Sequence, residues 1–251
     1  MTKDEQLNFL IQRLLPKAEL PPTTEEKWRL FRSLVNVREP APVDDDFLAI
    51  QDELLRLLIA EKGITNIDDL RPLRGNLYLW RGDITTLKVG AIVNAANSGM
   101  LGCFMPCHTC IDNAIHTFAG VQLRLECAEI MRKQGHAEPT GKAKITPAFN
   151  LPCDYILHTV GPIIRGNVSN EDKQLLVDCY RSCLSLAEEH SIESIAFCCI
   201  STGEFHFPNE EAADIAVNTV STFLKTSKQK KKIVFNVFKE QDEIIYGRLL
   251  G

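Results

Sequence analysis

Two short segments in the C-terminal part of the chain are almost entirely apolar: IAFCCI at residues 195–200 and IVFNVF at 233–238, in which Asn236 is the one polar residue. Strands of this kind are expected where helices cover both faces of a sheet, so that no side chain meets water. The sequence predicts further strands at 77–81, 91–94, 143–147 and 155–160, and helices at 111–133, 171–190, 210–225 and 242–250. Strands that alternate with helices predict an α/β layer fold.

The first seventy residues follow a different pattern. Three helical patterns are separated by prolines, and none of the segments is a convincing strand. Thr2 with Glu5, and Thr23 with Glu26, have the spacing of capping boxes that begin helices. The third helix should cover residues 45–62 and end at Gly63. The chain is therefore expected to have a helical N-terminal extension, residues 1–70, and an α/β domain, residues 71–251.

Composition and charge argue against several classes of protein. The chain has 251 residues, a net charge of −5 and nine cysteines, and it contains no apolar run long enough to span a membrane. Its first residues lack the pattern of a secretion signal, so we expect a cytoplasmic protein whose cysteines are thiols or metal ligands. The acidic balance argues against nucleic acid and membrane partners. The basic run at 225–232 is read as a solvated helix end.

In open α/β sheets, ligands bind outside the carboxyl ends of the strands. Unusual segments follow the predicted strands there: RGDIT (81–85), IVNAANSGMLG (92–102), GKAKITPAFNLPCDYILHTVGP (141–162) and ISTGEFHFP (200–208). Together with IDNAIH (111–116), these motifs resemble those of a macrodomain, the ADP-ribose-binding module. The resemblance implies a three-layer α/β/α fold with a mixed central sheet.

The cysteine-rich GCFMPCHTC insert and the helical extension make the chain similar to zinc-containing microbial macrodomains, which are protein ADP-ribosyl hydrolases. Those proteins are associated with a sirtuin-like ADP-ribosyl transferase and a lipoyl-carrier protein. The resemblance implies an enzyme that acts on mono-ADP-ribosylated proteins at the distal ribose C1″ linkage and releases ADP-ribose.

The resemblance also implies roles for individual residues. Asp83 should accept a hydrogen bond from the adenine amine, Asn97 should bind the distal ribose, and Asp112 stands at the position of the catalytic aspartate. The loop STGEF should hold the diphosphate through backbone N–H groups. The implied catalytic residues are Asn97 and Asp112; the implied substrate-binding residues are Asp83, Ile84, Asn97, Ser201, Thr202, Gly203, Glu204, Phe205, His206 and Phe238. Residue-level alternatives stay open: Asp83 and Asp112 could be helix-start acids, and His206 and Phe238 could serve in packing.

The loop between Asn97 and Asp112 carries Cys103, His108 and Cys110 within eight residues. Zinc prefers such cysteine and histidine sets, and three protein ligands leave the fourth position of a catalytic zinc open. A fourth ligand, Cys107 or His116, would instead make the zinc structural. A redox pair of Cys107 with Cys110 is a third reading.

The sequence thus predicts a zinc-dependent hydrolase that removes mono-ADP-ribose from proteins. One alternative is a non-enzymatic ADP-ribose reader, which needs neither Asp112 nor a metal. Another is a hydrolase of small derivatives such as O-acetyl-ADP-ribose, which would use the same pocket. A nucleotide phosphotransferase is disfavoured, because the chain has no phosphate-binding loop of the G-x-x-x-x-G-K-[ST] type.

Overall fold

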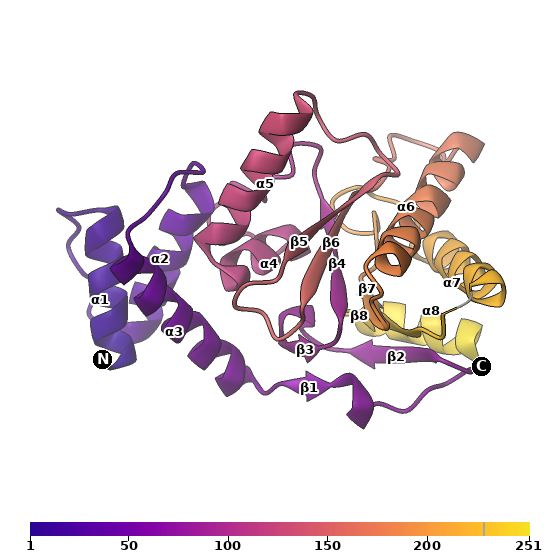
Figure 1. Ribbon diagram of the computed structural model, residues 1–251, viewed down its shortest axis with the longest axis horizontal. Helices are drawn as coiled ribbons and strands as arrows, with labels where there is room; N and C mark the ends of the chain where they lie inside the picture. The colour runs from indigo at the N-terminus through magenta and orange to yellow at the C-terminus, as the bar shows by residue number, and fades with distance from the viewer. Residues whose placement is uncertain (228) are drawn as a thin grey trace.

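A computed structural model describes residues 1–227 and 229–251. Its centre is a six-stranded sheet with the order β2-β8-β7-β4-β6-β5 (Figure 1). The strands are β2 (Leu77–Arg81), β4 (Ala91–Ala96), β5 (Ala143–Pro147), β6 (Tyr155–Val160), β7 (Ser194–Phe197) and β8 (Lys232–Val237). All neighbours are parallel except β5, which runs antiparallel to β6. The predicted mixed sheet is confirmed.

Helices cover both faces of this sheet. In Figure 1, α4 (Ile111–Ala119) and α5 (Val121–Gln134) lie on one side, and α6 (Asn170–Glu189), α7 (Asn209–Thr226) and α8 (Glu240–Leu250) lie on the other. Strands β7 and β8 are therefore buried on both faces along most of their length, as their largely apolar sequences require. This arrangement is the predicted three-layer α/β/α fold.

The prediction of one helix over residues 111–133 was wrong. Gly120 separates α4 from α5 with a φ of +99°, a left-handed conformation that an α-helix does not contain. A side chain at this position would meet Gln122, Gln51 and Asn150 at 2.4–3.0 Å, so the turn also needs the small residue. Hydrophobic periodicity continues through the break, which is why the sequence pattern did not reveal it.

Two strands end earlier than predicted. β7 ends at Phe197, three residues before Ile200, and the chain then turns into the loop that begins at Ser201. β8 ends at Val237, which leaves Phe238 outside the sheet with 78% of its surface exposed. In both cases the sequence stays apolar beyond the last residue that pairs with a neighbouring strand.

The N-terminal extension contains α1 (Lys3–Leu14), α2 (Thr24–Val37) and α3 (Asp45–Lys62). Both predicted capping boxes are present, at Thr2 and Thr23. The three helices share a small core of their own, whereas Leu55 and Ile59 of α3 pack into the core of the α/β domain. The division of the chain at residue 70 stays a prediction.

A short ladder joins the end of the extension to the α/β domain. β1 (Thr65–Asn66) pairs in parallel with β3 (Leu87–Lys88), so the expectation of no strand in the first seventy residues was wrong. Two 3₁₀ turns flank this ladder, η1 (Ile67–Asp69) and η2 (Ile84–Thr86). Two-residue strands are too short to show a period in the sequence.

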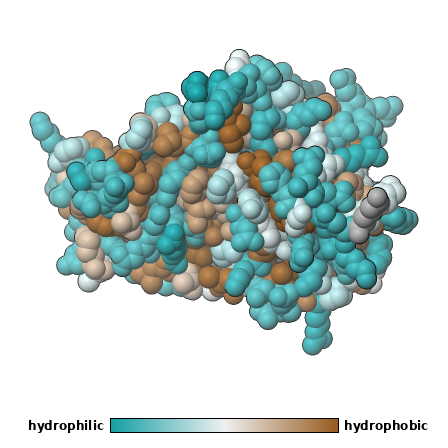
Figure 2. All heavy atoms as spheres, in the orientation of Figure 1, coloured by the Kyte–Doolittle hydropathy of each residue, from teal (hydrophilic) through white to brown (hydrophobic). Residues whose placement is uncertain are grey.

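Hydrophilic residues cover much of the face shown in Figure 2, with hydrophobic ones in separate patches between them. Among the described residues, none of the helices combines the length and apolar character needed to cross a membrane. Lys228 of the basic run at 225–232 lies outside the described residues.

The turn at Gly120 generates a stability prediction. Gly120→Ala should lower the free energy of unfolding by roughly 2–5 kcal/mol, because left-handed strain and steric overlap add together. Gly135→Ala is the matched control: φ is +77° there too, but an added Cβ meets nothing within 4 Å, and the cost should be about 1 kcal/mol. Urea unfolding of the two variants measures the difference, and equal costs would exclude the steric part.

Candidate active site

Residues from four strand ends meet at one edge of the sheet. Asp83 follows β2, Asn97 follows β4, the loop of residues 201–206 follows β7, and Phe238 follows β8. Since these strands are parallel, their carboxyl ends lie at the same edge. The topology therefore gathers the adenine, ribose and diphosphate residues implied by the sequence on one side of the molecule.

Asp112 lies beneath this edge, in the first turn of α4, with 5% of its surface exposed. Asn94 Nδ2 donates to its Oδ1 at 2.8 Å, and Asn97 Nδ2 donates to its Oδ2 at 3.2 Å. Asn97 Nδ2 also donates to the carbonyl of Gly102 at 3.0 Å. Each carboxylate oxygen thus accepts from an amide, and the exposed Asn97 side chain is fixed from below.

Burial raises the pKa of Asp112 to about 6, and the hydrogen bonds from Asn94 and Asn97 and the charge of Arg124 oppose that rise. His116 lies one turn away, with Nε2 at 3.6 Å from Asp112 Oδ1. Burial lowers the pKa of His116 well below its usual range, so the imidazole is neutral. The contact is therefore neither an ion pair nor a hydrogen bond, and both ring nitrogens of His116 lack a partner among the described residues.

A second group of possible metal ligands lies under the site: His116, Cys127 and His158, all buried. His158 already uses both ring nitrogens, one with Asn94 at 3.1 Å and the other with Thr146 Oγ1 at 2.9 Å. Burial lowers the pKa of His158 to about 3, so this ring is also neutral. These contacts make His158 part of a hydrogen-bonded layer that supports Asn94, and through Asn94 the carboxylate of Asp112.

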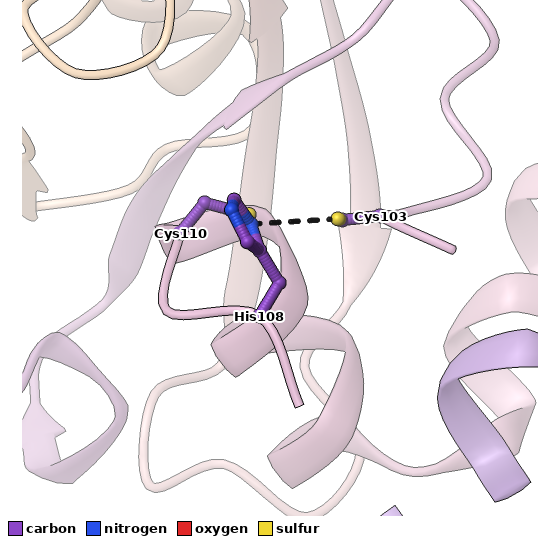
Figure 3. Close-up of side chains that lie close together, drawn as sticks. All are labelled: Cys103, His108 and Cys110. Atoms are coloured by element: carbon purple, nitrogen blue, oxygen red, sulfur yellow. Dashed lines mark hydrogen bonds between the residues drawn. The ribbon is translucent and has the colours of Figure 1, made fainter. Parts of the chain in front are cut away.

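The predicted metal ligands do come together. One donor atom from each of Cys103, His108 and Cys110 lies within 4.8 Å of the other two, and Figure 3 shows the three side chains converging. Cys103 Sγ is 3.6 Å from His108 Nδ1. The other nitrogen of His108, Nε2, lies 3.9 Å from a carboxylate oxygen of Glu204, so the loop after β7 reaches this group.

Cys110 has two local roles. It is the N-cap of α4, and its Sγ accepts a hydrogen bond from the N–H of Asn113 at 3.4 Å. Burial raises the pKa of the Cys110 thiol to about 12. A nearby cation is therefore what would hold this sulfur as a thiolate at neutral pH.

Cys107 lies outside the group. Its Sγ faces the carbonyl oxygen of Arg29 at 3.4 Å, and all nine cysteines are free thiols. The structure thus brings neither Cys107 nor His116 to the other three ligands, and it does not pair Cys107 with Cys110. This arrangement leaves the set at three protein donors.

The loop of residues 201–206 closes on itself through backbone hydrogen bonds. The N–H of His206 donates to the carbonyl of Gly203, and that of Phe207 donates to Ser201. In the described part of the chain, the N–H groups of Gly203, Glu204 and Phe205 have no acceptor. Three successive N–H groups without an acceptor are donors that an anion could use.

Two residues of this loop have left-handed backbones without being glycine: Ser201 with φ +65° and His206 with φ +59°. Glycine would adopt this conformation without strain, whereas both of these residues carry a side chain. Ser201 Oγ is buried and has no partner, whereas Thr202 Oγ1 already donates to the carbonyl of Cys199 at 3.0 Å.

At the adenine end, Asp83 caps η2: its Oδ1 accepts from the N–H of Thr85 at 3.0 Å and from its hydroxyl at 2.6 Å. Its other oxygen pairs with Lys62 of α3 at 2.8 Å. The capping role considered from sequence is therefore present, and an adenine contact would have to share this carboxylate. Ile84 is buried in the core, so only its backbone could face a ligand.

The Macro domain family model matches residues 93–216. A protein-ADP-ribose hydrolase from Treponema medium is 56% identical over 261 residues, which span the whole of both chains. The chain belongs to the macrodomain family. A protein-ADP-ribose hydrolase from Staphylococcus aureus strain MSSA476 is 55% identical over 229 residues, 90% of this chain and 86% of its own.

The fold comparison agrees with this assignment. A mutant of the Oceanobacillus iheyensis macrodomain with ADPR superimposes with a TM-score of 0.65 and is 37% identical. It covers 72% of this chain and 95% of its own length.

Sequence reasoning missed the residues that support this macrodomain site from behind. Asn94 interrupts the apolar strand β4 and is completely buried, a signal that could have marked it as a hydrogen-bonding residue. Asn113 lies within the IDNAIH motif but was given no role there, Arg32 and Asn36 lie in no motif, and only the fold shows that all three contact the cysteine-rich loop.

The positions of the donor atoms predict that substitution of Cys103 or Cys110 affects zinc binding, whereas substitution of Cys107 does not. Cys103→Ala and Cys110→Ala should each abolish stoichiometric zinc binding, because two protein donors hold zinc poorly. Cys107→Ala is the control and should keep one zinc per chain, since its sulfur faces the carbonyl oxygen of Arg29. Metal analysis of the purified proteins measures this, and zinc loss in Cys107→Ala would show that Cys107 is recruited as a fourth ligand.

Proposed function

We propose that this macrodomain is a zinc-dependent hydrolase that removes mono-ADP-ribose from modified proteins. The observation that carries the proposal is the convergence of Asp112, Asn97 and the Cys103, His108, Cys110 group at the start of α4. A protein that only binds ADP-ribose needs neither a buried carboxylate nor a set of metal donors beside it. The names of the relatives at 55–56% identity support the same reaction.

The donor set suits zinc. Two thiols and an imidazole are soft and borderline ligands, and three protein donors are typical of catalytic zinc. When bound, zinc would supply Lewis-acid polarisation and a water molecule of lowered pKa. Cys103, His108 and Cys110 would hold it, directly before the helix turn that carries Asp112.

Asn97 and Asp112 would act at the distal ribose. Asn97 is exposed at the sheet edge. Its Nδ2 donates to Asp112 and to the carbonyl of Gly102, and its Oδ1 accepts from the N–H of Gly99 at 3.0 Å, so the amide is fixed and the second lone pair of this oxygen would accept from a ribose hydroxyl. Cleavage of a bond at C1″ builds positive charge on the sugar. The carboxylate of Asp112 would stabilise this charge from below, because charge fixed in a buried site acts strongly.

The rest of the ligand would follow the sheet edge. The free N–H groups at Gly203, Glu204 and Phe205 would hold the diphosphate. Asp83 would bind the adenine amine, and the exposed ring of Phe238 lies at the end of β8, where it could cover the base. With the adenine and the diphosphate bound in these places, the C1″ linkage would lie beside Asn97 and the three possible metal ligands Cys103, His108 and Cys110.

The test is release of ADP-ribose from a mono-ADP-ribosylated protein. We would use serine-, arginine- and carboxylate-linked substrates together with a modified lipoyl-carrier protein, the partner that the sequence resemblance implies. Release that stops on zinc removal and returns on zinc addition is the expected result. Tight ADP-ribose binding without release from any substrate would favour a reader, and turnover of O-acetyl-ADP-ribose alone would favour a small-molecule hydrolase. The cytoplasmic location stays a prediction.

Two substitutions should separate chemistry from binding. Asp112→Ala should lower kcat by roughly 10²–10⁴-fold, because the buried carboxylate acts next to the bond that breaks. Asp83→Ala should instead weaken ADP-ribose binding by about 10- to 100-fold, the worth of a hydrogen bond to a charged group. Calorimetric titration and single-turnover assays measure the two effects. An unchanged kcat in Asp112→Ala would make this residue a helix-start acid only.

A further inference from the structure

We propose that helix α2 of the N-terminal extension positions the metal ligands, through Arg32 and Asn36. The segment concerned is residues 103–110, here called the metal loop. This inference rests on the proposed zinc site, and it assigns a task to the extension, for which the sequence offered only packing. Neither residue is a ligand; both would act by fixing the loop that carries the ligands.

Asn36 joins the metal loop to α4. Its side chain is 1% exposed, its Oδ1 accepts from the N–H of Cys107 at 2.9 Å, and its Nδ2 donates to Thr117 Oγ1 at 3.0 Å. Both ends of the amide are therefore used, one on the loop and one on the helix that follows it. About two turns earlier in α2, the carbonyl of Arg29 accepts from the sulfur of Cys107.

Arg32 holds the loop beside its histidine. One guanidinium nitrogen donates to the carbonyl of His108 at 2.7 Å and to Asn113 Oδ1 at 2.8 Å. Asn113 is completely buried and in turn donates to the carbonyls of Met105 and Cys103, at 3.0 and 3.4 Å. Arg32 and Asn113 together thus fix the backbone at three positions of the metal loop, two of which carry ligands.

The loop conformation needs such support. Cys107 has a left-handed backbone with φ +53°, which costs energy for a residue with a side chain. Exposed residues occupy much of the loop, so it has little core of its own to hold this shape. Without the contacts from α2, binding zinc would have to order the loop, and the entropy lost would reduce the affinity.

The test measures zinc affinity directly, by competition with a chromogenic chelator. Asn36→Ala and Arg32→Ala should each raise the Kd for zinc about 10-fold or more, since each removes one hydrogen bond to the metal loop and one to α4, the helix that follows it. Arg29→Ala is the matched control on the same helix face: Arg29 contacts the loop only through its backbone carbonyl, so its Kd should not change.

A second control separates positioning from general loss of stability. Leu10 is completely buried in the extension's own core, and Leu10→Ala should destabilise the extension without touching the metal loop. We expect it to keep the wild-type Kd for zinc at a temperature where all variants are folded. A Kd in Leu10→Ala that rises as much as in Asn36→Ala, for a similar fall in melting temperature, would overturn the proposal.

These measurements distinguish a failure of the positioning role from a failure of the proposed hydrolase function. If the wild-type protein releases ADP-ribose while Asn36→Ala and Arg32→Ala bind zinc as tightly as wild type, the positioning role is wrong and the proposed function stands. If both variants lose zinc affinity but the wild-type protein releases no ADP-ribose, the positioning role stands and the proposed function is wrong. A wild-type protein that binds no zinc would overturn the positioning role.

Discussion

The site depends on keeping a carboxylate buried. Asp112 is almost completely shielded from water, and an ionised group in such a place must be hydrogen-bonded or lose its charge. Asn94 and Asn97 provide these bonds, and Asn94 is itself supported by His158 and Thr146 on neighbouring strands. The chain thus places a polar stack in the middle of an apolar sheet. The same bonds that keep Asp112 charged also fix the direction of Asn97.

Helix α4 connects the hydrogen-bonded residues around Asp112 to the group formed by Cys103, His108 and Cys110. Cys110 caps the helix, Asp112 occupies its first turn, and Asn113 binds the loop that carries Cys103. These residues belong to one short helix and the loop before it, and the carboxylate of Asp112 is only two residues from Cys110. The contacts of α2 with this loop therefore bear on both parts of the site, which is a physical reason for the extension to pack where it does.

Much of this could be predicted from sequence, for identifiable reasons. The doubly buried strands and the capping boxes have strong local patterns, and the side chains that converge before α4, Cys103, His108 and Cys110, lie within eight residues of one another. The break at Gly120 and the ends of β7 and β8 depend on tertiary contacts that apolar composition conceals. Asn36 and Arg32 are separated by more than seventy residues from the atoms they bind, so no local pattern could reveal them.

The position of Lys62 shows how closely the extension is joined to the ligand edge. Its ammonium group pairs with Asp83 and lies 3.5 Å from the ring centre of Phe118 in α4. An adenine amine would have to share the Asp83 carboxylate with this lysine, whereas Thr85 keeps the other oxygen in its cap. The extension therefore meets the α/β domain at both ends of the proposed ligand, at the adenine through α3 and at the metal loop through α2. Packing alone would require neither contact to be polar.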